Sequence, residues 1–385
     1  MTRTAQEPAR PGQAPAAEPT WDEVVAFVRD ALASFSPGTP ISRDVWRRCG
    51  AFGLLGLPVP REHGGRGLTA LASARTLEAL GYACAHNGLM AAIAAHLLSC
   101  VVPLWRRGSD DQKERYLGRL CRGEWIAAHA ATEPEAGSDI FALRTRARRE
   151  GGEYVLDGCK TLSLSAPLAD LFVVFAHVTP EPAPEGVTAF LVERGTPGAT
   201  VTRSIEMAGL RGAVMGEIVF EGCRVPESNR LGPEGDGTLI FHLAMRWERS
   251  LFLSSHVGGM RRVLEQAVER ARARRQFGRP ISEFQSVSNR LAEMKVRLEL
   301  SRLALHAAAR SVDEGRRDAL EPSIAKLYIS EAAAASYLDA LRIHGGRGFT
   351  REAEFADDLM DALGTTLLSG TSDVQRQIIA RQIGA

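Results

Sequence analysis

The stretch Thr132-Glu133-Pro134-Glu135-Ala136-Gly137-Ser138-Asp139 (residues 132–139) lies where the patterning of the chain changes from helical to strand-like. Before this stretch, apolar residues recur at the spacing of one helical face, as at Val24, Val28 and Leu32. Helical periodicity returns after Gly237 and holds to the end of the chain. Between the two helical parts come short β-rich runs separated by Gly, Pro and Asp, at 154–158, 171–178, 187–192 and 217–225.

This order of helices, strands and helices predicts an α+β protein with three parts. We expect an N-terminal helical domain over 20–127, a middle β domain over 128–234 and a C-terminal helical bundle over 235–385. Residues 1–19 are rich in Pro and Ala and contain no apolar core, so we expect a disordered tail and no signal peptide. Helices and strands do not alternate along the chain, which argues against a Rossmann domain.

Composition narrows the class of partner. The 385 residues include 47 Lys and Arg against 46 Asp and Glu, so a net charge of +1 provides no field for nucleic acid or an anionic membrane. No stretch is expected to match the apolar run of a membrane helix. The six cysteines form no Cys-x-x-Cys pair, which argues against a zinc site or a disulfide framework. We therefore expect a reducing, cytoplasmic location, with no metal.

The loop at 132–139 has two interpretations. Gly137 permits a tight turn, and the Thr132 and Ser138 hydroxyls lie beside backbone N–H groups, which suits a polar planar ring or an anion. A capped surface loop is the alternative, and the residues by themselves favour it.

Arginine is concentrated between Arg261 and Arg279, where seven arginines face only two acidic residues, Glu265 and Glu269. Arginine forks match phosphate oxygens, so a pyrophosphate is a plausible ligand, with Phe277 packing on a neighbouring ring. Nucleic acid would need more aromatic residues and a longer basic stripe. The glycines of 345–348 follow a helical pattern instead of a strand, and by themselves indicate a helix C-cap and turn.

Six motifs occur in the order and spacing of one family. They are TEPEAGSD (132–139), GCKTLSLSAPLADLFVVFA (158–176), GLRGAVMGEIVFEGCRVP (209–226), RRQFGRPISEFQSV (274–287), IHGGRGF (343–349) and SGTSDVQR (369–376). From Trp21 to its C-terminus the chain resembles the acyl-CoA dehydrogenase family. The resemblance implies an all-α N-terminal domain, a β-barrel-like middle domain and a C-terminal four-helix bundle. It also implies FAD held between the subunits of a homotetramer or homodimer.

The resemblance assigns site residues position by position. Ser138 and Arg249 would lie along the substrate channel. The residues near the isoalloxazine would be His129, Ala131, Thr132, Gly137, Ser138, Leu162 and Leu164. The residues near the pyrophosphate and adenosine would be Arg274, Gln276, Phe277 and Gln285. The contacts across the subunit interface would come from Arg342, Gly345, Gly346, Thr371 and Asp373.

The catalytic base departs from the commonest pattern of the family. Many members have a Glu just before Gly-Thr-Ser in the C-terminal motif, whereas this chain has Ser369. Isovaleryl-type and long-chain-type members instead place the Glu on an earlier helix before an Arg, and Glu248 occupies that place here. The backbone N–H of Ser369 would still contribute to the oxyanion site.

The local pattern also supports Glu248. On one continuous helix it would share a face with small or apolar residues, so its carboxylate would point into a dry, narrow space. The alternative is a Glu248 paired with Arg246 or Arg249 on a solvated face. The residues expected on the face of Glu248 are Ala244, Leu251, Phe252, Ser255 and Gly259.

A second departure concerns the flavin N5 atom. The family usually has a Thr that hydrogen-bonds N5, whereas this chain has Leu164, which cannot donate. Strand alternation would send Ser163 and Ser165 to the face opposite Leu164. We therefore expect hydride acceptance at N5 to be altered.

The resemblance implies FAD-dependent α,β-dehydrogenation of an acyl thioester on CoA or a carrier protein. Glu248 would take the α-proton and flavin N5 the β-hydride. The electron acceptor would be a flavoprotein or oxygen, and the atypical motifs favour a biosynthetic role. A flavin monooxygenase and a non-catalytic protein that binds FAD or an acyl carrier are the alternatives.

Overall fold

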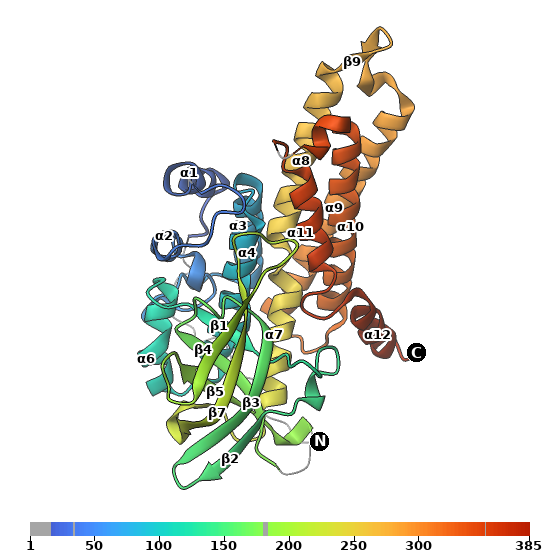
Figure 1. Ribbon diagram of the computed structural model, residues 1–385. Helices are drawn as coiled ribbons and strands as arrows, with labels where there is room; N and C mark the ends of the chain where they lie inside the picture. Colours follow the sequence, from blue (N-terminus) through green and yellow to red (C-terminus); the bar gives the residue numbers. More distant parts are fainter. Residues whose placement is uncertain (1–16, 34, 180–183, 351) are drawn as a thin grey trace.

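The computed structural model describes residues 17–33, 35–179, 184–350 and 352–385. It has a helical N-terminal part, a central sheet and a helical C-terminal part (Figure 1). The predicted fold class is therefore confirmed. Of the predicted N-terminal tail, residues 1–16 lie outside the described residues. Residues 17–19 are described, and there Glu18 contacts Arg75 at 3.4 Å while Pro19 is buried.

The N-terminal helices begin at residues whose side chains cap them. Thr20 and Glu23 form a capping box at α1, and Ser109 and Gln112 form another at α6, which satisfies backbone N–H groups that have no partner within the helix. The helices are α1 (Trp21–Ala31), α2 (Arg43–Phe52), η1 (Leu54–Gly56), η2 (Arg61–His63), α3 (Ala70–Ala83), α4 (Asn87–Ala94), η3 (Ala95–Val101), α5 (Val102–Arg107) and α6 (Asp110–Cys121).

The segments α4, η3 and α5 form one long helix, Asn87–Arg107. By length and composition alone this helix is apolar enough to span a membrane, but 89% of its apolar window is buried inside the protein. The expectation that no stretch approaches such a run is therefore wrong. The burial identifies it as the core helix of the N-terminal part. Its middle, η3, is a π-helix.

Eight strands form one mixed sheet within the described residues, and it follows the order β6-β7-β3-β2-β4-β5-β8, with β1 paired to β4. The β-rich runs predicted from the sequence are confirmed as β3, β4, β5 and β7. The patterns of β1, β2 and β6 did not predict strands, because β1 is only four residues long and the other two are largely exposed. The strands are β1 (Ala127–Ala130), β2 (Arg146–Glu150), β3 (Glu153–Leu164), β4 (Leu171–His177), β5 (Val187–Glu193), β6 (Ala199–Ile205), β7 (Met215–Pro226) and β8 (Arg230–Leu231), with the short helices η4 (Ile140–Ala142), η5 (Pro184–Gly186) and η6 (Glu227–Asn229) between them.

The C-terminal helices pack around α10, which contacts α7, α8, α9, α11 and α12. Gly345 has φ +64° and caps the C-terminus of α10, so the C-cap interpretation of the 345–348 glycines is confirmed. The elements are α7 (Gly237–Leu251), α8 (Ser254–Ala273), β9 (Arg275–Gln276), β10 (Arg279–Pro280), η7 (Ile281–Glu283), α9 (Gln285–Asp313), α10 (Leu320–His344), η8 (Gly345–Phe349), α11 (Phe355–Thr365) and α12 (Ser372–Gln382).

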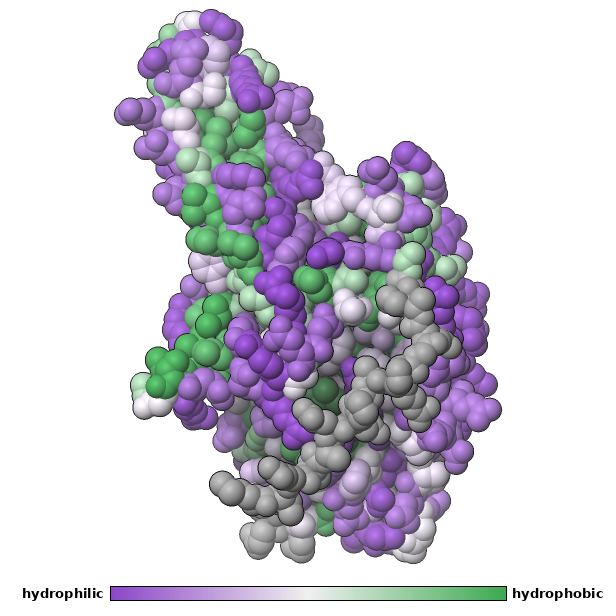
Figure 2. Space-filling model, turned by 180° about the vertical axis from the view of Figure 1, so that it is seen from behind, coloured by the Kyte–Doolittle hydropathy of each residue, from purple (hydrophilic) through white to green (hydrophobic). Residues whose placement is uncertain are grey.

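The helices α8 and α9 protrude beyond the rest of the protein and carry β9 and β10 at their tip (Figure 1). On α9, Val296, Leu300 and Leu303 are exposed at the spacing of one helical face. The view from behind shows hydrophobic residues gathered on these protruding helices (Figure 2). This part of the surface therefore carries an apolar face that no described residue covers.

The chain breaks its helix after Leu251, and α8 begins only at Ser254. The continuous helical face expected from Ala244 to Gly259 is therefore wrong. Ser255 and Gly259 belong to α8. A Cβ added to Gly259 would lie only 2.4 Å from the Tyr337 hydroxyl, so Gly259 packs closely against α10. Glu248 accordingly lies near the end of its own helix.

Candidate functional site

Glu248 lies on α7 with only 8% of its surface exposed. Both of its carboxylate oxygens accept a hydrogen bond from a serine. Ser369 Oγ donates to Oε1 at 2.6 Å, and Ser99 Oγ donates to Oε2 at 2.5 Å. The structure therefore brings together the two positions, 248 and 369, at which the resemblance places a base. Ser99 was not among the predicted site residues.

Ser369 is held in an unusual conformation. Its φ of +57° lies in the left-handed region, which L-residues with a side chain rarely adopt. The Ser369 carbonyl accepts from Arg249 Nε at 3.3 Å and from Gln375 Nε2 at 3.2 Å. The Ser369 N–H donates no hydrogen bond to any described residue, so it is available to an oxygen of a ligand.

Arg246 and Arg249, the arginines nearest to Glu248 in the sequence, form no ion pair with its carboxylate. Arg246 Nη2 donates to the carbonyl of Ser311 at 2.7 Å, whereas Arg249 contacts the Ser369 carbonyl. Burial lowers the pKa of Arg249, although the nearby Glu248 charge opposes this shift. The alternative of an ion-paired Glu248 on a solvated face is therefore wrong.

Lys326 is a second buried ionisable group close to this site. It lies on α10, and its only hydrogen bond among the described residues runs from Nζ to the Thr366 carbonyl at 3.3 Å. Burial and, to a smaller extent, the Arg249 charge together lower its pKa to about 8, against the opposing charges of Glu331 and Glu248. No predicted motif included this lysine, because a single Lys in a helical pattern carries no signal of burial.

A buried ion pair fixes the loop at 132–139. Lys160 on β3 contacts Glu133 Oε1 at 2.7 Å and donates to the Ala131 carbonyl at 3.1 Å. Glu133 also accepts from the N–H groups of Arg144 and Thr145 and from the Thr145 hydroxyl. The pair thus joins the loop, β3 and the segment before β2.

The pKa values of this pair are shifted by burial and by each other. Burial lowers the pKa of Lys160 to about 8, although Glu133 opposes the shift. For Glu133, burial opposes ionisation, but Lys160 and the Thr145 and Arg144 donors together hold its pKa below the usual value. Glu133 and Lys160 were not predicted as site residues, and only the contact between them reveals their role.

His129 links this loop to Glu248. Its imidazole packs against the rings of Phe175 at 5.1 Å and Phe241 at 6.0 Å, and burial lowers its pKa to about 4, so the ring is neutral near pH 7. Phe241 precedes Glu248 by seven residues on α7, which places both on one helical face, roughly 10 Å apart along the axis. The loop and the carboxylate therefore lie along the same side of α7.

Strand β3 is irregular where it borders the loop. Its register against β7 shifts between Lys160 and Ser163, and Leu162 has φ +52° and is 52% exposed. Ser163 is buried and its Oγ has no partner among the described residues, whereas Leu164 is half-buried. This bulge presents the apolar side chain of Leu162 instead of pairing it within the sheet.

The residues around this bulge fit one face and edge of a planar aromatic ring. Leu162 offers an exposed apolar surface, and the Thr161 N–H donates to the Thr132 carbonyl at 2.9 Å, which joins that surface to the loop. The Thr132 hydroxyl makes no hydrogen bond to a described residue, and a Cβ on Gly137 would meet nothing within 4 Å. Ala131 is buried and Ser138 is exposed.

The predicted phosphate and adenosine residues lie elsewhere in the chain. Arg274, Gln276 and Phe277 are exposed at the protruding tip, with Phe277 at 94% exposure and φ +50°. Figure 1 shows this tip far from the sheet, so a single chain does not bring it to Leu162. Gln285 begins α9 near the tip.

The remaining predicted contacts lie on other helices. Arg342 contacts Asp339 at 3.5 Å on α10. A Cβ added at Gly345 or Gly346 would meet no other atom within 4 Å, so the space beside both glycines is empty. Thr371 caps α12 by accepting from the Val374 N–H at 3.2 Å, and Asp373 contacts Arg376. Thr371 lies two residues after Ser369, so α12 begins directly beside the Glu248 site.

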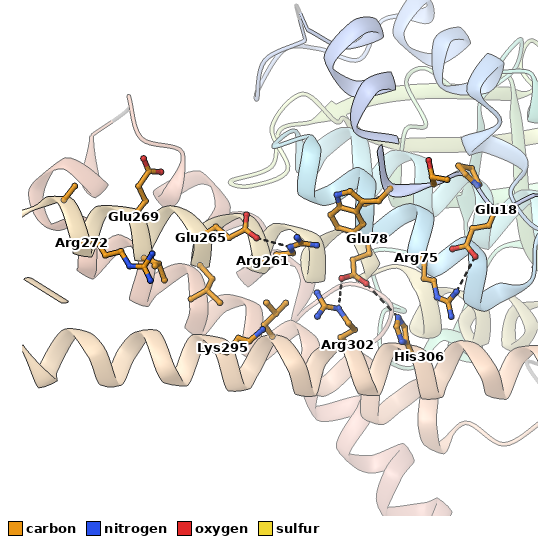
Figure 3. A pocket seen from close by; sticks show the side chains of 18 residues that line it. Glu18, Arg75, Glu78, Arg261, Glu265, Glu269, Arg272, Lys295, Arg302 and His306 are labelled. Carbon is orange, nitrogen blue, oxygen red and sulfur yellow. Dashed lines mark hydrogen bonds and ion pairs between the residues drawn. The ribbon is translucent and has the colours of Figure 1, made fainter. Parts of the chain in front are cut away.

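A groove of about 1280 Å³ lies away from these residues, between the N-terminal part and α8 and α9 (Figure 3). Many of its charged side chains contact one another, as in Arg302 with Glu78 at 2.9 Å and Arg261 with Glu265 at 3.0 Å. None of the predicted site residues lines it. We therefore locate the site at Glu248 instead of at this groove.

Comparison with known proteins agrees with this geometry. The N-terminal, middle and C-terminal domain models of acyl-CoA dehydrogenase match residues 18–124, 128–223 and 235–384. An L-prolyl-[peptidyl-carrier protein] dehydrogenase of Pseudomonas fluorescens is 46% identical over 339 residues, covering 88% of this chain and 89% of the relative. A mitochondrial isovaleryl-CoA dehydrogenase of Oryza sativa is 35% identical over 368 residues, covering 94% and 90%.

Solved structures show the same likeness. The crystal structure of the prolyl acyl carrier protein oxidase AnaB has a TM-score of 0.91 and 42% identity, covering 95% of this chain and 98% of that one. PigA with FAD and proline has a TM-score of 0.91 and 40% identity, covering 94% and 96%.

The buried pair gives a first prediction. Lys160→Met leaves the Glu133 carboxylate buried without its counter-ion, so we expect a loss of about 3 kcal/mol in the free energy of unfolding. Urea unfolding followed by circular dichroism measures this loss. Lys295→Met, which removes an exposed lysine contacting Glu299, is the control and should change stability by less than about 1 kcal/mol. Equal stability of the two variants would contradict a structural role for the pair.

Lys326 gives a prediction with a defined pH dependence. Its folded-state pKa of about 8 lies below its ordinary value of 10.5, so below pH 8 the folded protein holds a buried charge at a cost. The stability of the wild type should rise between pH 8 and 10.5, where only the unfolded chain keeps the proton. Lys326→Met should therefore be more stable than the wild type at pH 7, by up to about 3 kcal/mol, and this difference should shrink as pH rises above 8. A difference that grows with pH over this range would show that the sign is wrong.

Proposed function

We propose that this chain, which belongs to the acyl-CoA dehydrogenase family, is an FAD-dependent dehydrogenase of an aminoacyl thioester, with an L-prolyl group on a carrier protein as substrate. The observation that carries the proposal is the Glu248 carboxylate, buried and held beside Ser369. The names of the relatives at 46% and 42% identity, both L-prolyl-[peptidyl-carrier protein] dehydrogenases, support this choice of substrate.

Glu248 removes the proton from the α-carbon of the thioester. The negative charge that then develops on the carbonyl oxygen needs donors, and the free N–H of Ser369 supplies one. Burial of Glu248 excludes water from the base, which favours transfer of the α-proton over exchange with solvent. Arg249 fixes the Ser369 segment through its carbonyl and lines the path of the substrate together with Ser138.

FAD, when bound, would supply the hydride acceptor for the hydrogen on the β-carbon. We propose that the loop at 131–138 and Leu162 hold its isoalloxazine ring, with the Thr132 hydroxyl at the polar edge. Leu164 carries no hydrogen-bond donor, so no hydroxyl at position 164 assists N5. The neutral His129 behind the loop adds no positive charge to this site.

A second copy of the chain completes the cofactor site in this proposal. Arg274, Gln276 and Phe277 lie at the tip of the protruding helices, too far from the loop of their own chain to share one ligand with it (Figure 1). The apolar face of Val296, Leu300 and Leu303 on α9 supports a homodimer or homotetramer. Arg342, Gly345, Gly346, Thr371 and Asp373 would add contacts across the interface, with Gln285 near the adenosine.

Further proposals concern the cellular setting. The six cysteines all lie in the described part of the chain and are free, which supports a reducing, cytoplasmic location. A carrier-bound substrate favours biosynthesis over the breakdown of fatty acids. The reduced cofactor would pass its electrons to a flavoprotein or to oxygen. Mixing the reduced protein with air distinguishes these two acceptors, because rapid reoxidation of the flavin indicates oxygen and slow reoxidation indicates a flavoprotein.

The tip residues give a prediction on cofactor retention. Arg274→Ala removes a bidentate phosphate contact but no core packing, so we expect FAD to be lost while the fold is retained. The ratio of flavin to protein absorbance after gel filtration measures FAD content, and circular dichroism measures the fold. Arg272→Ala, at an exposed arginine two residues earlier near the end of α8, is the control. FAD content equal in the two variants would contradict the two-chain site.

The central test is an anaerobic titration of the flavin absorbance with L-prolyl carrier protein, L-prolyl-CoA and isovaleryl-CoA. We expect the carrier-bound prolyl thioester to reduce the flavin fastest. Glu248→Gln should keep its FAD and slow this reduction by roughly 10²–10⁴-fold, since a positioned base is lost. Glu269→Gln, an exposed glutamate on α8, should not slow it.

The outcomes separate the competing functions. Absence of anaerobic reduction by every thioester would favour a monooxygenase or a non-catalytic binding protein. Full reductive activity in Glu248→Gln would exclude Glu248 as the base.

A further inference from the structure

The Glu248 carboxylate is enclosed by charged and titratable groups that do not bond to it. Arg249 on its own helix donates to the Ser369 carbonyl, and Lys326 on α10 donates to the Thr366 carbonyl. The Cys100 thiol on η3 is fully buried, and burial together with the Glu248 charge raises its pKa well above its ordinary value, so it stays protonated. Among the described residues, only the hydroxyls of Ser99 and Ser369 donate to the carboxylate.

Ser99 reaches Glu248 from the π-helical segment η3. The Val102 N–H at its end donates to the Leu97 carbonyl five residues earlier, whereas an α-helix would use the carbonyl of Leu98. The segment is anchored on its other side, because His96 Nδ1 accepts from the Ala127 N–H at 3.0 Å at the start of β1. The π-helical turn therefore joins β1 and the loop after it to the carboxylate on α7.

One serine comes from the N-terminal helical part and the other from the C-terminal helical part, and they donate to different oxygens of the same carboxylate. Hydrogen bonds to both oxygens favour the ionised form and fix the rotation of the group. Each oxygen keeps a further lone pair, so the carboxylate remains able to accept a proton from a substrate. A serine that only filled space would not need its Oγ within 2.5 Å of the carboxylate.

We propose that Ser99 is a positioning residue for Glu248, and that Ser99 and Ser369 together form a two-hydroxyl clamp, which keeps the carboxylate ionised and aimed at the substrate. This inference rests on the proposed role of Glu248 as the base. It assigns a function to the Ser369 side chain in addition to that of its N–H, and it gives the π-helical segment a part in the reaction.

The first test compares pH profiles of anaerobic flavin reduction in the FAD-bound enzyme. In Ser99→Ala the ionised carboxylate loses a donor, so the acid limb of the profile should move to higher pH, and on that limb the rate should fall about tenfold for each pH unit of displacement. Ser99→Thr keeps the hydroxyl and should restore the wild-type profile. Ser301→Ala, at a fully buried serine whose Oγ has no hydrogen-bond partner among the described residues, is the matched control and should leave the profile unchanged.

A second measurement does not depend on turnover. Infrared difference spectra between the wild type and Glu248→Gln isolate the carboxylate band of Glu248 during a pH titration. In Ser99→Ala the midpoint of this titration should move in the same direction as the acid limb, and in Ser369→Ala it should do so as well. FAD content and melting temperature should stay close to those of Ser301→Ala.

The outcomes distinguish the clamp from the function on which it rests. If the wild type is reduced by prolyl thioester but Ser99→Ala matches it in profile and infrared midpoint, the clamp is wrong and the function stands. If no thioester reduces the wild type, the proposed function fails, and the infrared titration still decides whether Ser99 controls the charge of Glu248. A shift in Ser99→Ala that Ser99→Thr does not reverse would assign Ser99 to packing alone.

Discussion

Helix α7 is constrained by all three parts of the protein at once, and the site depends on this constraint. It contacts η3, α3 and α5 of the N-terminal part, β5 of the sheet, and α9 and α10 of the C-terminal part. Phe241 faces the sheet through His129, while Glu248, two turns later, faces Ser99 and Ser369. A helix packed on so many sides has little freedom to rotate, so one carboxylate can be placed accurately without any bond to an arginine.

Buried ionisable side chains occur at several contacts between these parts. Lys160 and Glu133 are withdrawn from water together, with enough donors around the carboxylate to satisfy it, whereas Lys326 has only a carbonyl. Desolvated groups of this kind reduce stability unless each is bonded, and they are most common where a site needs a defined charge. Here they lie at the loop 132–139 and beside Glu248.

Periodicity predicted the long elements and the order of the three parts, because long amphipathic helices and buried strands repeat at distinct spacings. Motif spacing led to Glu248 and Ser369, which lie in contact. The remaining site residues depend on tertiary contacts that no local pattern encodes. Ser99 lies within an apolar run and resembles any small core residue, and the partnership of Lys160 with Glu133 spans a strand and a loop. The bulge at Leu162 exposes an apolar side chain that strand periodicity did not predict, although Ser163 and Leu164 after it pair in regular register with Gly216 and Met215. The helix break after Leu251 removed Ser255 and Gly259 from the face of Glu248.

The π-helical segment Ala95–Val101 also bears on how such a site could change over generations. A π-helical turn accommodates one additional residue within a helix, and the widening is confined to that turn. The flanking helices α4 and α5 can therefore keep their packing whether the additional residue is present or not. An insertion or deletion of a single codon would then add or remove a side chain facing α7 while the surrounding core stays intact. The environment of the carboxylate in this fold is thus open to change by the length of one helix as well as by substitution.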